Sequence, residues 1–467
     1  MNGMSRSPSP ARLCALLESL ETGLLERQTA VRLCLLAALA GEHVLLIGPP
    51  GTAKSELARR LHRAFAGARY FERLLTRFST PEELFGPLSL KALEDDRYER
   101  LTDGFLPTAG IAFLDEVFKA NSAILNALLT LLNEREFDNG CGRVRTPLVS
   151  VVGASNEIPG DEALQAFFDR FILRVPVHPV SDDAFSALLN LQSGTVDVEA
   201  PMSAAERAGV AQAAAQVRLG AQAQAACHAL RAWLQAQELT LSDRRWRQWM
   251  QLLRVAAATE GRDEIDELDL WTASYVACAT PQDVPKLAAW FEHDLLDARP
   301  QDAPWLTRAV EAFEKQLEIE LSAPDDPDAA NAAGKLALAR SMAGSEQGEQ
   351  LLRMVSGTLE EKLRRRYSPV HVAARVAQVD EVLAQAREQH EAAAAREQAL
   401  AQRLQGRLWL PPELAERLLL AHARTRGVMA ALIGRLLATR EGFADLPVNE
   451  QLETVAPAPV LLHAVNA

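Results

Sequence analysis

Apolar and polar positions in the first 180 residues alternate between short continuous apolar runs and segments with helical spacing. The apolar runs, typical of strands buried on both faces of a sheet, are Val44–Ile47, Tyr70–Arg77, Ile111–Leu114, Leu148–Gly153 and Ile172–Val175. The segments with helical spacing are Leu13–Glu21, Arg27–Leu39, Ser55–Ala66, Ser122–Glu134 and Glu162–Arg170. This alternation predicts an α/β core over residues 13–180, a mostly parallel sheet sandwiched by helices, after a disordered start at 1–12.

Two segments interrupt the alternation. Residues 87–107 form a charged insertion with a polar middle and alternating flanks, which we interpret as a protruding β-hairpin. A second ribbon, Arg135–Pro147, contains Asn139-Gly140, a strong signal for a hairpin turn.

Strand patterns disappear after residue 180. Residues 181–300 are rich in alanine and leucine at helical spacing and predict an all-α lid domain. Three long amphipathic segments follow and predict an antiparallel helical bundle over 301–445, with a short insertion around 324–368 and a disordered tail at 446–467. These segments are Pro304–Leu321, Val370–Leu404 and Glu413–Arg440. The apolar seam from Val372 to Leu404 favours a bundle core over an intermolecular coiled coil.

The charge and the contents of cysteine and histidine limit the kinds of partner, compartment and metal site that we expect. The 49 basic and 62 acidic residues give a net charge of −13, which argues against a surface that mainly binds nucleic acid or anionic membrane. The 5 cysteines form no CxxC pair, and no transmembrane or export segment is evident, so we expect a cytoplasmic protein without stable membrane insertion. The 9 histidines form no HxxxH or Cys/His cluster, so we expect no protein metal site built from them.

A glycine-rich turn follows the first apolar run, in the stretch VLLIGPPGTAKS. Backbone N–H groups of such a turn, together with the start of the next helix, can hold nucleotide phosphates. Lys54 would neutralise phosphate and Ser55 would ligate Mg²⁺. Ala53 stands where the motif expects glycine. The candidate phosphate-binding residues are Gly48, Pro49, Pro50, Gly51, Thr52, Ala53, Lys54, Ser55 and Glu56.

Two acids end the third predicted strand. Asp115 would hold Mg²⁺ through water, and Glu116 would polarise the attacking water. The alternative interpretation is a pair of acids that cap a helix start. Their position after a phosphate-binding loop favours the catalytic interpretation.

Asn156 follows the fourth strand, at the sheet edge where doubly wound folds bind ligands. It could orient the lytic water and report the γ-phosphate, although a plain turn asparagine has the same pattern. Arg170 precedes the last strand and faces away from its own nucleotide site, which would let it reach a neighbouring subunit. The alternative for Arg170 is a surface ion pair with Asp169.

Arg244 opens a helix in the lid after Leu241-Ser242-Asp243. Ser242 or Asp243 is a plausible N-cap of that helix. Arg244 lies where a lid helix could present it to phosphates, and Arg245 is the competing choice.

The ordered motifs GPPGTAKS, IAFLDE, GASNE, DRF and LSDRR resemble the MoxR group of AAA+ ATPases. Within that group the chain is most similar to the RavA (regulatory ATPase variant A) subgroup, which tolerates alanine at position 53. The resemblance implies hexameric rings that bind ATP and Mg²⁺ between subunits and remodel protein substrates with a von Willebrand factor A (VWA) domain partner. The implied site residues are Lys54 and Ser55 (Walker A), Asp115 and Glu116 (Walker B), Asn156 (sensor 1), Arg170 (arginine finger) and Arg244 (sensor 2).

RavA relatives insert a compact domain with β structure into the bundle, whereas residues 324–368 have little strand pattern here.

Two other functions remain open at this point. A nucleic-acid or chelatase-type motor is one alternative, although the insertion at 87–107 carries more acids than bases. A scaffold whose nucleotide cycle merely sets its assembly is the other.

Overall fold

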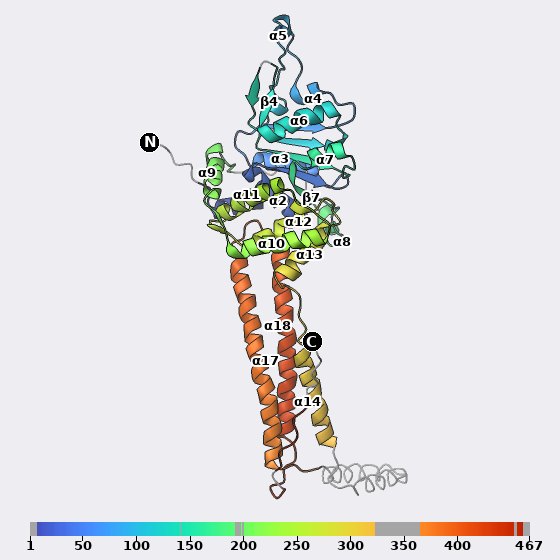
Figure 1. The fold of residues 1–467 in the computed structure, drawn as a ribbon, viewed down its shortest axis with the longest axis vertical. Helices are drawn as coiled ribbons and strands as arrows, with labels where there is room; N and C mark the ends of the chain where they lie inside the picture. The colour runs from blue at the N-terminus through green and yellow to red at the C-terminus, as the bar shows by residue number, and fades with distance from the viewer. Residues whose placement is uncertain are drawn as a thin grey trace, which may run out of the picture. The chain divides into compact units, whose positions relative to one another are not determined.

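The computed structural model describes residues 7–140, 142–191, 198, 200–322, 365–452 and 455–460. Contacts divide the chain into two units (Figure 1). Unit 1 comprises Met1–Asp297 with Leu404–Ala415, and unit 2 comprises Ala298–Arg403 with Glu416–Ala467.

Unit 1 is built on a 5-stranded sheet with the order β2-β3-β6-β1-β7, in which all neighbours are parallel. The strands are β1 (His43–Ile47), β2 (Tyr70–Leu74), β3 (Ile111–Asp115), β6 (Ser150–Ser155) and β7 (Phe171–Pro176). Every residue of β1 and β6 is buried, which explains why their sequences are continuous apolar runs. The predicted α/β fold and its strands are confirmed.

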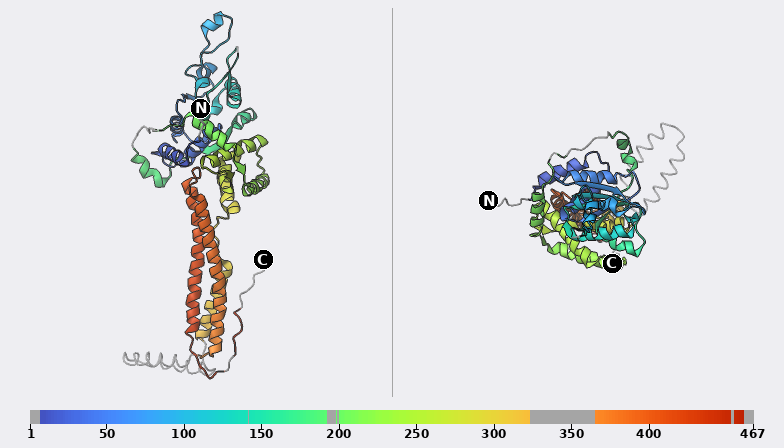
Figure 2. Two further views of the ribbon diagram at one scale, coloured as in Figure 1. Left: turned by 90° about the vertical axis from the view of Figure 1, so that its left-hand side faces the viewer. Right: turned by 90° about the horizontal axis from the view of Figure 1, so that it is seen from above.

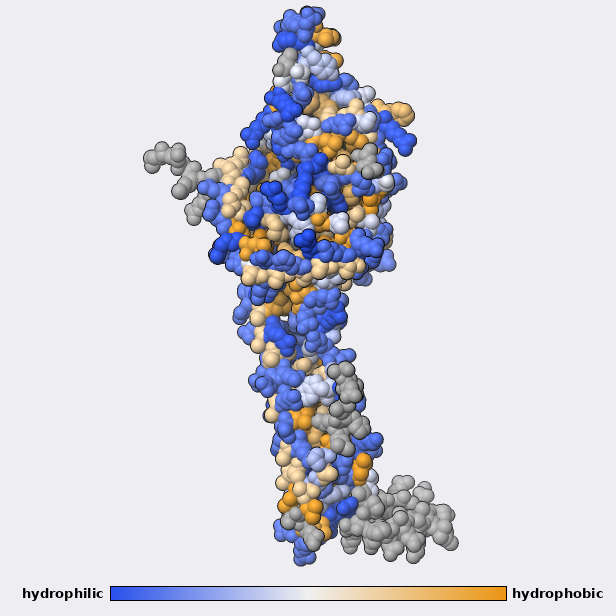
Figure 3. Space-filling model, in the orientation of Figure 1, coloured by the Kyte–Doolittle hydropathy of each residue, from blue (hydrophilic) through white to orange (hydrophobic). Residues whose placement is uncertain are grey.

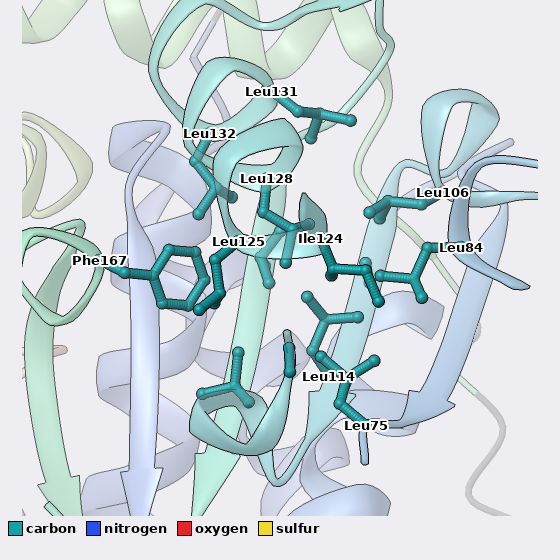
Figure 4. Close-up of a cluster of buried hydrophobic side chains, with 14 of the residues drawn as sticks. Leu75, Leu84, Leu106, Leu114, Ile124, Leu125, Leu128, Leu131, Leu132 and Phe167 are labelled. Carbon is teal, nitrogen blue, oxygen red and sulfur yellow. The ribbon is translucent and has the colours of Figure 1, made fainter. Parts of the chain in front are cut away.

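Helices cover both faces of this sheet. Leu45, Ile47 and Leu114 belong to a single apolar cluster on one face of the sheet, together with residues of α6 (Ser122–Glu134) and α7 (Glu162–Phe168). Figure 4 shows Leu114 in this cluster beside Ile124, Leu125 and Leu128. The helices α2 (Gln28–Ala40) and α3 (Lys54–Arg63) pack against the sheet at β1 and β3. Alternating strand side chains therefore fill two apolar layers.

The ordered chain begins earlier than the sequence predicts. Helix α1 (Pro10–Glu21) starts with proline at its first position, and the Ser9 hydroxyl accepts a hydrogen bond from the Arg12 backbone N–H at 3.3 Å. The expected disorder at 1–12 is therefore wrong for residues 10–12, and residues 1–6 lie outside the described part.

The insertion at 87–107 is not the β-hairpin we expected. A single antiparallel bridge joins Leu88 to Arg100, and between them lies the short helix α5 (Leu90–Glu94). The Ser89 hydroxyl caps this helix by accepting from the Ala92 N–H at 3.2 Å, and leucine, lysine, alanine and glutamate are good helix formers. We call this segment, Pro87–Pro107, the arm; Leu90 and Leu93 near its end are exposed, and apolar surface is visible at the top of Figure 3.

The second ribbon agrees with the sequence. Strands β4 (Glu136–Asp138) and β5 (Arg143–Arg145) pair antiparallel around Asn139-Gly140. Two further short helical pieces, α4 (Pro81–Phe85) before the arm and η1 (Leu106–Thr108) at its end, contact each other.

The lid follows the last strand and is helical, as predicted, apart from one pair of two-residue strands. Its helices are α8 (Asp182–Leu189), α9 (Ala204–Ala214), α10 (Ala221–Ala236), α11 (Asp243–Thr259), α12 (Ala273–Ala277) and α13 (Val284–Trp290). The small parallel pair joins β8 (Arg218–Leu219) to β9 (Glu264–Ile265). Pairs this short carry no periodicity that a sequence could show.

Unit 2 contains α14 (Pro304–Ser322), α17 (Pro369–Leu404) and α18 (Pro412–Ala444), which lie side by side in both views (Figures 1 and 2). Ion pairs of Arg440 with Asp380 at 2.6 Å and of Arg426 with Glu397 at 2.7 Å show that α17 and α18 are antiparallel. Apolar residues of all three helices form one buried cluster. The seam of α17 therefore packs in a bundle core, as we inferred.

Several described residues of the segment after 445 are more ordered than we expected. Leu446 is buried, Val448 bridges to Tyr367, and the Ala458 carbonyl accepts from Arg375 at 2.8 Å. The expected disorder from 446 is therefore wrong for these residues. The insertion expected at 324–368 lies outside the described residues except at its last four positions.

In the described part of the chain, no helix is both long enough and apolar enough to cross a membrane.

Candidate nucleotide-binding site

The phosphate-binding loop leaves the carboxyl end of β1 at a glycine that has no room for a side chain. A Cβ atom on Gly48 would overlap the carbonyl oxygen of Val177. The Gly48 N–H donates to the Ser155 carbonyl at 3.0 Å, which ties the loop to the end of β6. Only glycine allows this close approach of backbone to backbone.

Ala53 occupies the left-handed region, with φ 66°, directly before α3. This conformation explains why the motif expects glycine at the position, since a Cβ atom costs about 1 kcal/mol there. Gly51 is also left-handed at φ 80°, and the space its side chain would occupy is open. The loop therefore has an open mouth and one strained residue.

The Lys54 ammonium lies over the loop. It donates to the carbonyls of Gly48 at 2.7 Å and Pro49 at 2.8 Å, and lies 3.5 Å from the Asn156 side-chain oxygen. Burial lowers the pKa of Lys54, and the nearby carboxylates of Asp115 and Glu116 oppose that shift. A half-desolvated cation in this position interacts strongly with an anion that enters the loop.

Asp115, Glu116 and Asn156 meet because β3 and β6 are neighbours whose carboxyl ends share one edge. The Asn156 amide donates to the Glu116 carboxylate at 2.6 Å. Glu116 is left-handed at φ 50°, and its backbone N–H donates to the Asp115 carboxylate at 3.0 Å. The Glu116 carboxylate also lies 3.3 Å from the Lys119 ammonium.

The remaining loop residues have supporting positions. The Thr52 hydroxyl donates to the Pro49 carbonyl at 2.9 Å, and the Glu56 carboxylate pairs with Arg60 at 2.9 Å, so Glu56 offers the site its backbone N–H. Ser55 is in the first turn of α3 and is half-buried.

This set fits Mg²⁺-ATP. The open loop mouth, the buried ammonium and the adjacent acid pair match a triphosphate and its metal ion. Among the described residues no group of three or more His, Cys, Asp or Glu side chains could hold a metal by itself. The Asp115 and Glu116 carboxylates beside the loop suit Mg²⁺, because this ion keeps several water ligands and binds through one or two carboxylates together with phosphate.

Sequence reasoning missed Arg27. Its buried guanidinium donates to the Thr52 carbonyl at 3.2 Å and to the His178 carbonyl at 2.6 Å, so it anchors the loop to the chain after β7. Burial lowers the pKa of Arg27, an effect that the neighbouring Glu26 opposes. One arginine before an apolar helix gave no signal of this contact, since the carbonyls it reaches are 25 and 151 residues away.

Arg170 lies at the opposite edge of the sheet. It precedes β7, whose Phe171 pairs with His43 at the start of β1. Asp169 accepts hydrogen bonds from Arg174 at 3.0 Å and Arg245 at 3.5 Å, so the partners recorded for Asp169 differ from the Arg170 pair we considered. The Arg170 Nε is buried without a hydrogen-bond partner in the described structure.

The two lid arginines have different positions. Arg245 is buried and donates to the backbone carbonyls of Phe171 at 3.2 Å and Ile172 at 2.9 Å, which makes it a packing residue. Arg244 is exposed and donates to Asn133 at 2.9 Å. Of the two, only Arg244 is available to a ligand.

Neither Arg170 nor Arg244 is brought to the loop of its own chain. Gln248, one turn after Arg244, donates at 2.8 Å to Glu42, which immediately precedes β1. The loop lies at the other end of β1, about 16 Å away for five residues of strand. The structure thus brings Lys54, Asp115, Glu116 and Asn156 together at the carboxyl ends of the strands. Both arginines lie toward the amino ends of the strands.

Two family models match this chain. The first is described as the MoxR domain in the MoxR-vWA-beta-propeller ternary systems and matches residues 11–214. The second is described as an AAA lid domain and matches residues 224–291.

Three curated proteins are similar in sequence. Uncharacterized protein MJ0812 of Methanocaldococcus jannaschii is 39% identical over 284 residues, which cover 58% of this chain and 72% of that protein. Uncharacterized protein MJ0079 of the same organism is 52% identical over 164 residues, 35% of this chain and 43% of its own. Protein MoxR of Paracoccus denitrificans is 32% identical over 154 residues, 32% of this chain and 44% of its own.

Proposed function

Since this chain belongs to the MoxR-type AAA+ ATPases, we propose that it binds and hydrolyses Mg²⁺-ATP at the phosphate-binding loop, in a ring whose active sites lie between subunits. One observation carries the proposal. Lys54, Glu116 and Asn156 converge at the mouth of the loop, with Asp115 hydrogen-bonded beside them.

The residues of the site divide the work as follows. Bound Mg²⁺-ATP supplies the transferable phosphoryl group and the metal charge that stabilises it. Lys54 would exchange its contacts with the loop carbonyls for contacts with the phosphates, while Ser55 and Asp115 would hold the metal ion. Glu116 accepts the proton of the attacking water at its carboxylate, and Asn156 orients that carboxylate through their hydrogen bond.

A second subunit completes the site. Arg170 and Arg244 lie toward the amino ends of the strands, whereas the loop lies at the carboxyl end of β1, a strand about 16 Å long. We propose that they act as the arginine finger and sensor 2 at the next subunit's nucleotide, in a hexameric ring. An arginine supplied in this way raises turnover by on the order of 10³-fold or more.

The output is remodelling of protein substrates in the cytoplasm with a VWA-domain partner. The description of the matching family model, which names MoxR-vWA-beta-propeller ternary systems, supports that partner. The narrower RavA assignment rests on the motifs of the sequence and stays a proposal.

The nucleic-acid motor is the weaker alternative because the net charge is −13 and acids dominate the arm. ATPase activity that DNA or RNA stimulates, with the stimulation lost at raised salt, would favour that motor instead. Partner function that survives without turnover would favour the nucleotide-gated scaffold.

Three variants test the proposed site. Glu116→Gln should retain ATP binding and lose turnover by at least about 100-fold, because the base is removed and the cradle is not. Lys54→Ala should lose binding itself. Glu157→Gln, an exposed neighbour of Asn156, is the matched control and should behave as the parent. Normal hydrolysis by either of the first two variants would refute the assignment.

A further inference from the structure

Helix α8 has an apolar face that is exposed in the described part of the chain. None of its 8 residues is buried. Phe185, Leu188 and Leu189 are 52%, 40% and 71% exposed. Their spacing of three and four residues places these side chains on one face of the helix. A contiguous exposed apolar face of this kind marks an interaction surface.

The start of α8 lies beside the phosphate-binding loop. β7 runs parallel to β1, so the chain leaves it at the edge where the loop lies. Ser181, the N-cap of α8, donates its backbone N–H to the Glu26 carboxylate at 2.9 Å. The next residue, Arg27, holds the Thr52 carbonyl of the loop.

A surface that could receive α8 lies at the amino ends of the strands, at the other end of β1 from the loop. A trough of about 760 Å³ follows α11 and shares several lining residues with a hollow of about 470 Å³ between α10 and α11. Trp246 and Met250 line both, and supply apolar surface. The acids of the trough are Glu42 and Asp243, and its cations outnumber them. These cations are Arg244, Arg247 and Arg254.

The two surfaces match in chemistry. The first turn of α8 carries Asp182 and Asp183, one turn before the apolar face. The trough offers arginines beside Trp246 and Met250. The helix is acidic and apolar, and the trough is cationic and apolar. Because they lie at opposite ends of the strands in unit 1, the helix of one copy complements the trough of another copy.

We propose that α8 of one copy docks into the α11 trough of the next copy, with its acidic turn toward the arginines. This proposal rests on the proposed function and specifies how the neighbouring subunit is held. The contact is head to tail because α8 begins at the carboxyl ends of the strands and the trough lies at their amino ends, so it repeats from copy to copy and can close a ring. It also brings Arg244 to the loop side of the neighbour.

The first test removes the apolar contact in the full-length Glu116→Gln protein with Mg²⁺-ATP. Phe185→Asp combined with Leu189→Asp should raise the concentration of half-assembly by at least about tenfold in sedimentation velocity. Binding of ATP and the thermal midpoint should stay at the parent's values, since both side chains are exposed. Ile319→Asp, on α14 in unit 2 and 52% exposed, is the matched control and should assemble as the parent.

The second test exchanges charges. Asp182→Arg with Asp183→Arg should weaken assembly, and so should Arg247→Asp with Arg254→Asp. All four changes in one chain should restore it, because each α8 then meets an acidic trough on the next copy. The docking proposal is wrong if the α8 variants assemble like the parent, or if the combined variant assembles more weakly than both paired variants. Neither result would contradict the proposed ATPase activity. A parent that binds ATP only as a monomer would overturn the docking and the ring together.

Discussion

At the scale of single residues, the phosphate-binding loop holds a conformation that its sequence fits imperfectly. Ala53 is left-handed where glycine would be relaxed, and Gly48 has no alternative because of the Val177 carbonyl. The departure from the usual motif is therefore a cost in stability, because the Cβ atom of Ala53 stands in a left-handed conformation.

Replacing Ala53 by glycine tests this cost. Ala53→Gly should raise the free energy of unfolding of unit 1 by about 1 kcal/mol, because the strain of the Cβ atom is removed. Denaturant titration should show a higher midpoint at an unchanged slope. Ala58→Gly, in the interior of α3, is the control of opposite sign and should lose about 1 kcal/mol. A lower midpoint for Ala53→Gly would contradict the left-handed assignment.

Arg27 gives a second prediction at this scale. Arg27→Gln should weaken ATP binding by about tenfold, because the loop loses the guanidinium that joins the Thr52 and His178 carbonyls. Isothermal titration measures the effect. Arg59 on α3 forms a surface ion pair with Glu72 on β2. Arg59→Gln removes this pair and should change the affinity for ATP by less than about twofold. Equal affinities for both variants would show that Arg27 does not position the loop.

At the scale of elements, the arm and the β4–β5 ribbon are held together by the tip of the ribbon. The Asn139 amide accepts from the Arg100 N–H at 2.7 Å and donates to the Arg100 carbonyl at 3.2 Å. Gly140 is left-handed at φ 75°, and a Cβ atom there would overlap the Tyr98 carbonyl. The Asn-Gly pair thus serves the turn and the contact with the arm.

Gly140→Ala should separate the arm from the ribbon. Trypsin cleavage after Arg97 or Arg100 should become about tenfold faster, because the arm opens more often. ATP binding should be unchanged, since the arm's contact lies outside the candidate site. Gly142→Ala, where a Cβ atom meets open space, is the matched control. Equal cleavage of the two variants would exclude this contact as a restraint.

The elements also show what local patterns can predict. Buried parallel strands are apolar on both faces, so β1, β3 and β6 could be located from sequence alone. The arm was misassigned because its alternating flanks resembled strands, whereas a serine cap and helix-forming residues make α5. The two-residue pair of β8 with β9 is too short for any pattern.

At the scale of the whole molecule, contacts between distant residues decide the arrangement. The sequence marks Gly406 and Pro411-Pro412 only as a break between long helices. In the structure this break belongs to unit 1, where Trp409 is buried and donates to the Thr259 hydroxyl at 2.8 Å. Arg407 pairs there with Asp269 at 3.0 Å. Residues 138 to 150 positions apart leave no joint pattern in the sequence.

The same limit applies to the candidate site. Lys54, Asp115, Glu116 and Asn156 could be predicted because each follows a strand whose end lies at one sheet edge. The sequence also predicts that Arg170 faces away from its own site, because it precedes the last strand, and the structure has it at the amino end of β7. The position of Arg244 depends on the packing of the lid, which no local pattern shows. The separation of both arginines from the loop is the reason for placing the active site between two subunits.

Mixing two inactive variants tests that shared site most directly. Lys54→Ala removes the loop's cation, and Arg170→Ala removes the group offered to the neighbour, so each variant alone should hydrolyse ATP at no more than about one hundredth of the parent rate. In a random equal mixture, about a quarter of the junctions join an intact loop to an intact arginine, and activity should return to about that fraction of the parent. A mixture no more active than its components, or an Arg170→Ala protein as active as the parent, would contradict the account.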